Sequence, residues 1–464
     1  MSRPAAVVHR VIKAYDVRGL VGEEIDESFV FDVGAAFARL LRAEQADTEA
    51  IVIGYDMRES SPALAAAFAS GVRAQGLDTV DIGLASTDQL YFASGSLDCP
   101  GAMFTASHNP AAYNGIKLCR AGAKPVGRDT GLATISDDVI AGVPAYAGQH
   151  GLASRRDVLA DYGEFLRSLV DLTGTQPLRV AVDAGNGMAG LTTPAVLGPI
   201  PSISVEPLFF ELDGAFPNHE ANPLDPANLV DLQAHVLATR ADIGLAFDGD
   251  ADRCFVVDER GEPVSPSAVT ALVAARELGR EIGATIIHNL ITSRAVPELV
   301  TERGGTPVRS CVGHSYIKGL MAETGAIFGG EHSAHYYFRD FWGADSGMLA
   351  ALHVLAALGG QDRPLSDLMA DYQRYEPSGE INFTVDDAQA CIDAVLRSFG
   401  TRIVSIDHLD GVTVDLGEGT WFNLRTSNTE PLLRLNVEAR TKATVDEIVG
   451  HIGDEITSHT GVSR

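Results

Sequence analysis

Short apolar runs that lead into polar loops recur along the chain and predict an α/β protein. The runs Ala50–Gly54, Leu178–Val182 and Ala284–Ile287 suit buried strands and are too short for helices of usual length. Helix-forming stretches follow, as at Ser61–Pro62, where a serine cap and a first-turn proline open an alanine-rich segment. Three such strand–loop–helix modules before Asp371 predict three similar α/β domains.

The pattern changes after Asp371 and predicts a smaller α+β domain. Ile381–Val385 alternates as a half-exposed strand does, and Val412–Leu416 with Trp421–Leu424 forms a predicted hairpin. Glycine, proline and charged residues interrupt the pattern between modules and set the predicted boundaries. The expected fold class is therefore three similar α/β domains with mixed sheets plus a smaller C-terminal α+β domain, over residues 1–153, 154–257, 258–371 and 372–464.

The net charge excludes two classes of partner and leaves a third open. Lys+Arg 35 against Asp+Glu 62 gives −27, so we expect neither nucleic acid nor an anionic membrane as partner. A small anionic substrate remains compatible, because charges more than about 8 Å apart are largely screened at physiological salt. Arg18, in the strand-like stretch Val11–Gly19, is a candidate contact for such an anion, and a surface salt bridge is the alternative.

Cysteine usage and apolar run lengths predict a cytoplasmic protein without a membrane anchor. The cysteines are odd in number and scattered, so they indicate neither a disulfide framework nor a zinc site: Cys99, Cys119, Cys254, Cys311 and Cys391. The N-terminus has no long apolar segment, and the run Met348–Leu358 is too short to span a bilayer.

The hexapeptide Thr105–Pro110 places a hydroxyl after the predicted buried strand Gly101–Phe104. Ser107 would then lie at the carboxyl end of a strand, where α/β proteins usually bind ligands. Two interpretations remain open: a nucleophile, or a turn in which the serine hydrogen-bonds the backbone. His108 is adjacent, but in an extended chain its side chain would point the opposite way and leave Ser107 without a neighbouring base.

A second predicted strand leads into an acidic loop with aspartates at alternate positions: Asp248, Asp250 and Asp252. In an extended segment these carboxylates converge on one side, and their oxygens suit magnesium or calcium. A calcium-binding EF-hand is rejected, because Arg253 stands where that loop requires glycine and the strand-like Cys254–Val257 follows instead of a helix. A solvent-exposed acidic turn is the remaining alternative.

Glu331, Ser333 and His335 follow a third predicted strand, and spacing by two would direct them to one face. A carboxylate and a hydroxyl can bind sugar hydroxyls, and an imidazole suits proton transfer near neutral pH. The alternative is a glycine turn with a buried, hydrogen-bonded histidine.

The loop Arg425–Pro431 gathers hydroxyls, an amide and a guanidinium after a strand. These are the donors that a phosphate requires, and Arg434 adds a second guanidinium. An ordinary hydroxyl-rich turn is the alternative.

In this order, the four motifs resemble those of the α-D-phosphohexomutases, and in particular the bacterial phosphomannomutase type. The resemblance covers essentially the whole chain and rests on Thr105–Pro110, Asp248–Arg253, Gly330–His335 and Arg425–Pro431. It implies domains arranged around a central cleft and an intramolecular phosphotransferase that interconverts mannose 6-phosphate and mannose 1-phosphate. Small-molecule hexose phosphates are thus the expected partners.

The resemblance also implies a role for each motif. Ser107 is expected to be a phosphoserine that hands its phosphoryl group to the substrate, while the three aspartates and a phosphoserine oxygen hold Mg²⁺. Glu331 and Ser333 are expected to bind sugar hydroxyls. The phosphate that is not transferred is expected to be bound by Arg425, Ser427, Asn428 and Thr429, with Arg434 nearby. The remaining residues expected at the active site are Arg18, Lys117, Arg253 and His314, with Lys117 or His335 assisting proton transfer.

The expected reaction passes through a hexose 1,6-bisphosphate, which turns over and returns its other phosphate to Ser107. That bisphosphate is therefore also the expected activator. Some relatives active on glucose and mannose carry methionine at the position of His332, glycine at that of Ala334 and a lysine within Asn289–Ile291. Phosphoglucomutase or phosphoglucosamine mutase activity thus remains an alternative, and a non-catalytic sugar-phosphate sensor is a remote one.

Overall fold

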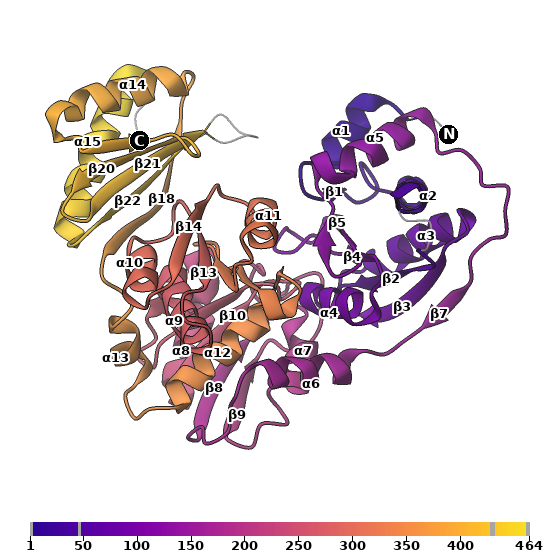
Figure 1. Ribbon diagram of the computed structural model, residues 1–464, viewed down its shortest axis with the longest axis horizontal. Helices are drawn as coiled ribbons and strands as arrows, with labels where there is room; N and C mark the ends of the chain where they lie inside the picture. The colour runs from indigo at the N-terminus through magenta and orange to yellow at the C-terminus, as the bar shows by residue number, and fades with distance from the viewer. Residues whose placement is uncertain (1–2, 45–47, 427–431, 461–464) are drawn as a thin grey trace. The chain divides into compact units, whose positions relative to one another are not determined.

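The computed structural model describes residues 3–44, 48–426 and 432–460, without the side chains of residues 314, 315, 459 and 460. The described chain contains four β-sheets with helices packed around them (Figure 1). It divides into two compact units: a first unit of residues 1–264, 321–328 and 333–366, and a second unit of residues 265–320, 329–332 and 367–464.

The first sheet is mixed and has the strand order β1-β5-β4-β2-β3-β7, with β6 beside β5. Its strands are β1 (Val17–Leu20), β2 (Ala50–Tyr55), β3 (Asp78–Leu84), β4 (Gly101–Phe104), β5 (Tyr113–Arg120), β6 (Lys124–Pro125) and β7 (Ala153–Arg155). Its helices are α1 (Ala5–Val11), α2 (Glu27–Glu44), α3 (Ser61–Ala74), α4 (Thr87–Leu97) and α5 (Leu132–Ala141). Because β2 is parallel to both β3 and β4, the loops after these three strands leave the same edge of the sheet.

The second sheet is also mixed, with the order β12-β11-β10-β8-β9. Its strands are β8 (Leu178–Asp183), β9 (Ile203–Leu208), β10 (Ile243–Phe247), β11 (Cys254–Val257) and β12 (Pro263–Val264), and its helices are α6 (Leu159–Leu169), α7 (Ala189–Val196) and α8 (Val230–Thr239). β10 runs parallel to β8 and antiparallel to β11, so the acidic loop forms the turn between β10 and β11.

The third sheet has the order β14-β13-β15-β16-β17 and combines a parallel pair, β13 and β14, with an antiparallel pair, β16 and β17. Its strands are β13 (Thr285–Asn289), β14 (Thr306–Ser310), β15 (Phe328–Gly330), β16 (Tyr336–Phe338) and β17 (Ala344–Asp345). The accompanying helices are α9 (Pro266–Arg280), α10 (Ala295–Glu302), α11 (His314–Thr324), α12 (Gly347–Gly359) and α13 (Leu365–Ala370).

The fourth sheet is antiparallel, with the order β18-β22-β21-β20-β19. It contains β18 (Glu376–Thr384), β19 (Ser405–Asp407), β20 (Val412–Gly417), β21 (Thr420–Thr426) and β22 (Leu432–Ala439), with helices α14 (Ala388–Phe399) and α15 (Lys442–Thr460). Its apolar face and the two helices share a separate hydrophobic core that includes Val395, Phe422 and Ile448. The predicted fold class, with three α/β domains and a smaller α+β domain, is confirmed, while the exact domain boundaries stay predictions.

Two local predictions are wrong. The strand-like stretch Val11–Gly19 forms a strand only at its end, since Val11 closes α1 (Ala5–Val11) and β1 begins at Val17. Ser60, not Ser61, precedes α3, and it makes no side-chain capping bond; the Ser61 hydroxyl instead donates to Asp56 Oδ1 at 2.6 Å. The hairpin of β20 and β21 is confirmed. Among the described residues, no helix is long and apolar enough to cross a membrane.

Candidate active site

The Ser107 loop begins where β4, which is buried along its whole length, reaches the edge of the first sheet. Ser107 adopts a left-handed conformation with φ 51°, and its N–H donates to Thr105 Oγ1 at 2.8 Å. The hydroxyl donates to Asp248 Oδ2 at 2.8 Å, although the two residues are 141 positions apart. The serine hydroxyl therefore lies against the acidic loop.

The expectation that His108 points away from Ser107 is wrong. Because Ser107 is left-handed, the two neighbouring side chains lie on the same side, and Ser107 Oγ is 3.1 Å from His108 Nδ1. The pKa of His108 is nevertheless lowered to about 2, first by burial and then by the positive charges of Arg253 and Arg18. His108 therefore contacts the serine as a neutral, weakly basic imidazole.

Asp248, Asp250 and Asp252 are buried, and each offers a carboxylate oxygen within 4.8 Å of the others. They converge through a turn and not along an extended segment: Ala251 has φ 60°, and its N–H donates to the Asp248 carbonyl at 3.0 Å. A Cβ atom on Gly249 would lie 2.5 Å from the Ser107 carbonyl oxygen, so only glycine permits the two loops to approach this closely.

The three carboxylates fit a hard divalent cation. Within the described part of the chain, the Oδ1 atoms of Asp250 and Asp252 are buried and have no hydrogen-bond partner. The pKa of Asp248 is raised to about 7, mainly by burial. The positive charge of Arg253 lowers this pKa, but the negative charges of Asp252 and Asp250 raise it again. Three clustered carboxylates with unbonded buried oxygens are the ligand set that Mg²⁺ or Ca²⁺ prefers.

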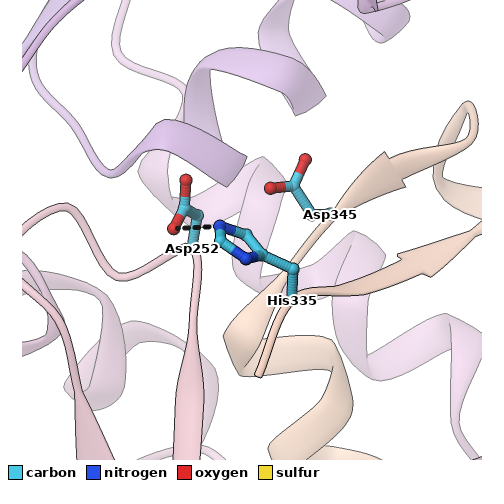
Figure 2. Close-up of side chains that lie close together, drawn as sticks. All are labelled: Asp252, His335 and Asp345. Atoms are coloured by element: carbon cyan, nitrogen blue, oxygen red, sulfur yellow. Dashed lines mark ion pairs between the residues drawn. The ribbon is translucent and has the colours of Figure 1, made fainter. Parts of the chain in front are cut away.

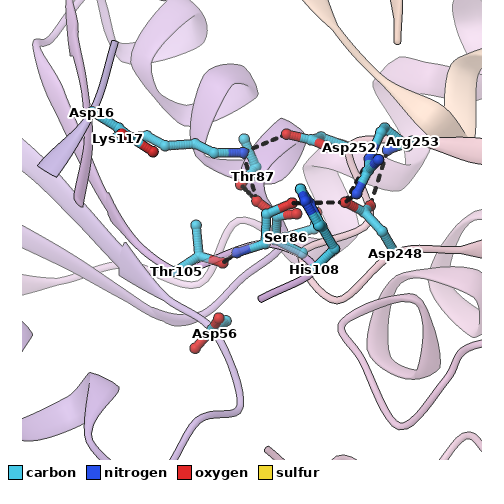
Figure 3. Close-up of polar contacts among 12 residues, drawn as sticks. Asp16, Asp56, Ser86, Thr87, Thr105, His108, Lys117, Asp248, Asp252 and Arg253 are labelled. Carbon is cyan, nitrogen blue, oxygen red and sulfur yellow. Dashed lines mark hydrogen bonds and ion pairs between the residues drawn. The ribbon is translucent and has the colours of Figure 1, made fainter. Parts of the chain in front are cut away.

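Two side-chain cations partly neutralise this cluster (Figure 3). Lys117 on β5 donates to Asp250 Oδ2 at 2.7 Å and to Asp252 Oδ2 at 2.5 Å. Arg253 Nε donates to Asp248 Oδ2 at 2.9 Å. Burial alone would lower the pKa of Lys117, but Asp250 and Asp252 hold that pKa well above its usual value, so the ammonium stays charged.

His335 lies beside the same cluster, as Figure 2 shows together with Asp345. Its Nε2 atom is 3.7 Å from Asp252 Oδ1, and an isolated antiparallel bridge joins its backbone to Arg253. The structure thus brings together Ser107, the three aspartates, Lys117, Arg253 and His335. Arg18 lies at the Ser107 loop, because its guanidinium donates to Asn109 Oδ1 at 2.7 Å. The guanidinium also donates to Asp16 Oδ2 at 2.5 Å.

The stretch from Glu331 to His335 is not the extended segment expected from its spacing. Ala334 has φ 65° and a turn precedes it, so the stretch does not run as a strand. Ser333 Oγ lies 3.2 Å from His335 Nδ1. In the second unit, the buried Glu331 carboxylate accepts from Asn289 Nδ2 at 3.3 Å.

Arg425 and Arg434 face each other across β21 and β22 in the second unit. Both guanidiniums approach the carboxylate of Glu380, at 3.6 Å and 3.4 Å. Among the described residues, the ion pairs of both guanidiniums are to Glu380, so there two positive charges face one carboxylate. Ser427, Asn428 and Thr429 lie outside the described residues, as does the side chain of His314, whose backbone begins α11.

Sequence reasoning missed two residues that contact this site, Thr87 and Arg58, and a third, Asp88, that lies next to Thr87. Thr87 Oγ1 donates to Asp250 Oδ2 at 2.6 Å, and the adjacent Asp88 links the start of α4 to Tyr162 and Ser346. Arg58 donates to backbone carbonyls of the Ser107 loop. Their position along the chain could have identified them. Thr87 and Asp88 follow β3 and Arg58 follows β2, and both strands end at the sheet edge from which the Ser107 loop leaves β4.

Comparison with protein families gives a match for each of the four domains. The models, described as phosphoglucomutase/phosphomannomutase α/β/α domains I, II and III and C-terminal domain, match residues 9–141, 160–261, 265–375 and 380–454. Together these matches extend over most of the chain.

Individual proteins agree with these matches. A protein from Xanthomonas campestris pv. campestris named "Phosphohexose mutases" is 43% identical over 440 residues, covering 94% of this chain and 96% of its own. A phosphomannomutase from Escherichia coli is 40% identical over 438 residues, covering 92% and 94%. The crystal structure of a phosphoglucomutase/phosphomannomutase family protein from Burkholderia thailandensis superposes with a TM-score of 0.87 at 32% identity, covering 99% and 98%.

Proposed function

Because the chain belongs to the phosphoglucomutase/phosphomannomutase family, we propose that this mutase interconverts mannose 6-phosphate and mannose 1-phosphate through a phosphoserine at position 107. The observation that carries the proposal is the hydrogen bond from Ser107 Oγ to Asp248 at the edge of a buried cluster of three carboxylates and two cations. A serine in an ordinary turn does not require such surroundings.

The metal in this proposal is Mg²⁺, held by Asp248, Asp250 and Asp252 with an oxygen of the modified Ser107. When bound, Mg²⁺ supplies positive charge next to the phosphoryl group that is transferred. The chain's own cations act in the same direction, since Arg253 and Lys117 are fixed by hydrogen bonds before any substrate arrives. Phosphoryl transfer depends mainly on such alignment and charge stabilisation.

Proton transfer is assigned to His335. As a substrate hydroxyl attacks phosphorus, the bond from phosphorus to the Ser107 oxygen breaks and the hydroxyl proton passes to the imidazole. Lys117 is less suited to accept it, because Asp250 and Asp252 keep its ammonium protonated. The return step reverses these movements with the other phosphate, and free hexose 1,6-bisphosphate phosphorylates an unmodified Ser107 and so activates the enzyme.

Substrate recognition is assigned to the remaining motif residues. Glu331 and Ser333 bind sugar hydroxyls, and the phosphate that is not transferred is bound by Arg425, Arg434, Ser427, Asn428, Thr429 and His314. The excess of guanidinium over carboxylate at Arg425 and Arg434 supports the phosphate assignment. Mannose as the main substrate rests on curated relatives named phosphomannomutase at about 40% identity, and some phosphoglucomutase activity is included in the proposal. The five free cysteines support a cytoplasmic location.

Mass spectrometry and kinetics together test this proposal. We expect intact-mass and peptide spectra of the purified protein to locate one phosphoryl group on Ser107, and Ser107→Ala to remove it with the activity. The values of kcat/KM for mannose, glucose and glucosamine 1-phosphates, measured with Mg²⁺ and hexose 1,6-bisphosphate, should be highest for mannose. If kcat/KM is highest for another sugar 1-phosphate, that sugar phosphate and not mannose 1-phosphate is the main substrate. Binding without turnover of any of the three would indicate a sensor.

A further inference from the structure

Arg58 lies behind the Ser107 loop and uses all five of its N–H donors. Nη2 donates to the carbonyls of Ser107 at 2.9 Å and Asn109 at 2.7 Å. Nη1 donates to the carbonyls of Pro110 at 2.9 Å and Tyr113 at 3.0 Å. Nε donates to Asp56 Oδ2 at 3.2 Å. One guanidinium thus binds four of the seven carbonyls between residues 107 and 113.

Three of these carbonyls, those of Ser107, Asn109 and Pro110, belong to an irregular turn, and the fourth is that of Tyr113, the first residue of β5. Ser107 is left-handed, and the turn is closed by two backbone bonds, from Asn109 to Ala106 and from Tyr113 to Pro110. A carbonyl that loses water on folding and gains no hydrogen-bond partner destabilises a conformation. The Arg58 donors satisfy the carbonyls only in this arrangement, and they therefore stabilise the turn that aims Ser107 Oγ at Asp248.

The guanidinium is itself held rigidly. Arg58 is 1% exposed, and its partner Asp56 is completely buried and also accepts from the Ser61 hydroxyl. Phe216 lies over the guanidinium at 5.2 Å, and a Cβ atom on Gly214 would lie 2.6 Å from the Arg58 Cα atom. Asp56 in turn follows β2, where its N–H donates to the Phe104 carbonyl at the end of β4. The position of Arg58 is thus fixed to the same sheet edge as the loop.

We propose that Arg58 is a positioning residue that holds the Ser107 hydroxyl in line for phosphoryl transfer, a role that rests on the function proposed above. Within the described residues, its side-chain hydrogen bonds go to backbone carbonyls and to the Asp56 carboxylate, so it acts through Ser107. The requirement is for the planar fork of arginine and not only for charge, because lysine has three donors on one nitrogen and cannot reach four separated carbonyls.

Kinetics of Arg58→Lys test the role in the full-length protein with Mg²⁺ and hexose 1,6-bisphosphate. We expect kcat per folded molecule to fall roughly 10²-fold, since a misplacement of about 1 Å costs that much, with KM for mannose 1-phosphate changed less than about threefold. Circular dichroism gives the folded fraction for the correction. A purely structural role would lower the folded fraction and leave the corrected kcat unchanged, and that result would overturn the proposal.

Two companion variants separate the carbonyl bonds from other effects. Asp56→Asn removes the charge of the ion pair but keeps an oxygen that can accept from Arg58 Nε, so we expect its corrected kcat to fall less than that of Arg58→Lys. A loss equal to that of Arg58→Lys would assign the effect to the buried ion pair and count against the proposal. Arg42→Lys is the matched control, because Arg42 also donates to a backbone carbonyl, that of Gln75, and lies over the ring of Tyr146.

Hydrogen exchange provides a test that needs neither a folded variant nor activity. In the unmodified protein, the amides of Asn109 and Tyr113 should exchange as slowly as those of β4 and β5. Exchange at the rate of an unstructured loop would overturn the proposal. If the protein without substitutions has no mutase activity, the proposed function is wrong. The exchange rates then still show whether the turn that Arg58 binds is rigid.

Discussion

Single residues at this site show that proximity and basicity are separate properties. Ser107 Oγ is 3.1 Å from His108 Nδ1, the geometry of a nucleophile and its base, yet the pKa of His108 is about 2. Lys117 shows the opposite effect, since two aspartates raise its pKa. The local charges therefore favour a phosphoryl acceptor that depends on surrounding cations and not on the adjacent histidine.

Lys117→Met should make the protein more dependent on Mg²⁺ for its stability. The substitution removes the ammonium from the buried Asp250 and Asp252, and an uncompensated buried charge costs about 3 kcal/mol. A divalent cation can replace that charge, so we expect a lower Tm in EDTA and a larger rise on adding Mg²⁺ than in the unmodified protein. Differential scanning calorimetry measures both, with the exposed Lys124→Met as control. An equal rise in both proteins would contradict this account.

His219 should contribute pH-dependent stability. Burial lowers its pKa, but the hydrogen bond and charge of Asp183, 3.0 Å from Nε2, outweigh burial and raise the pKa above 6.5. The folded state therefore binds a proton more tightly than the unfolded state. The stabilisation is complete below pH 6.5 and is lost as the pH rises through the folded pKa.

The comparison is the Tm of the unmodified protein and of His219→Gln between pH 5.5 and pH 9. We expect the difference between the two to shrink as the pH rises. A difference that is constant or that grows with pH would show that the ion pair does not form.

At the scale of elements, the site is made by turns that follow strands. Left-handed residues, Ser107, Ala251 and Ala334, occur in all three of the turns that carry Ser107, the aspartates and His335. Each reverses the chain locally, so the aspartates converge, as predicted, through a turn and not along an extended segment. The parallel arrangement of β2, β3 and β4 brings the loops that follow these strands to one edge.

Helix α4 is tied to two other elements by the buried carboxylate of Asp88. This group accepts from Tyr162 on α6 at 2.7 Å and from Ser346, the N-cap of α12, at 2.6 Å. Tyr162→Phe removes one donor, so we expect the free energy of unfolding to fall by about 1–3 kcal/mol. Chemical denaturation measures this free energy of unfolding, and Tyr146→Phe, a substitution at a half-buried tyrosine, is the control. No difference between the two variants would mean that the tyrosine bond adds nothing to stability.

At the scale of the whole molecule, the predicted functions are distributed over the two compact units. The first unit contains Ser107, the aspartates and His335, and the second contains Glu331, Arg425 and Arg434. The C-terminal domain has its own hydrophobic core, so we expect its hydrogen exchange to be governed by its own opening.

Mg²⁺ should therefore protect one part of the chain selectively. Ligand binding stabilises the elements that form the site, so we expect slower hydrogen exchange in the loops after β4 and β10 when Mg²⁺ replaces EDTA. The amides of β20, β21 and β22 should exchange at unchanged rates. Equal protection in both regions would show that the chain opens as one cooperative unit.

The sequence by itself determined the class of the fold and the four motifs. The strand–loop–helix pattern depends on neighbouring residues, so the sequence alone predicts it. Each of the motifs at Ser107, Asp248, Glu331 and Arg425 is a continuous stretch, so the sequence alone identifies it too. Family matches then confirmed the fold and the mutase class.

Only the tertiary structure decided which partners meet. The bond from Ser107 to Asp248 joins residues 141 positions apart, and Thr87, at the start of α4, and Arg58, after β2, contact the site from other segments. Sheet topology sets these contacts, and no local pattern records them. Side-chain direction within the motifs was equally inaccessible, because it depends on single left-handed residues. Packing of distant loops, and not spacing along the chain, places the Ser107 hydroxyl beside a buried cluster of three carboxylates.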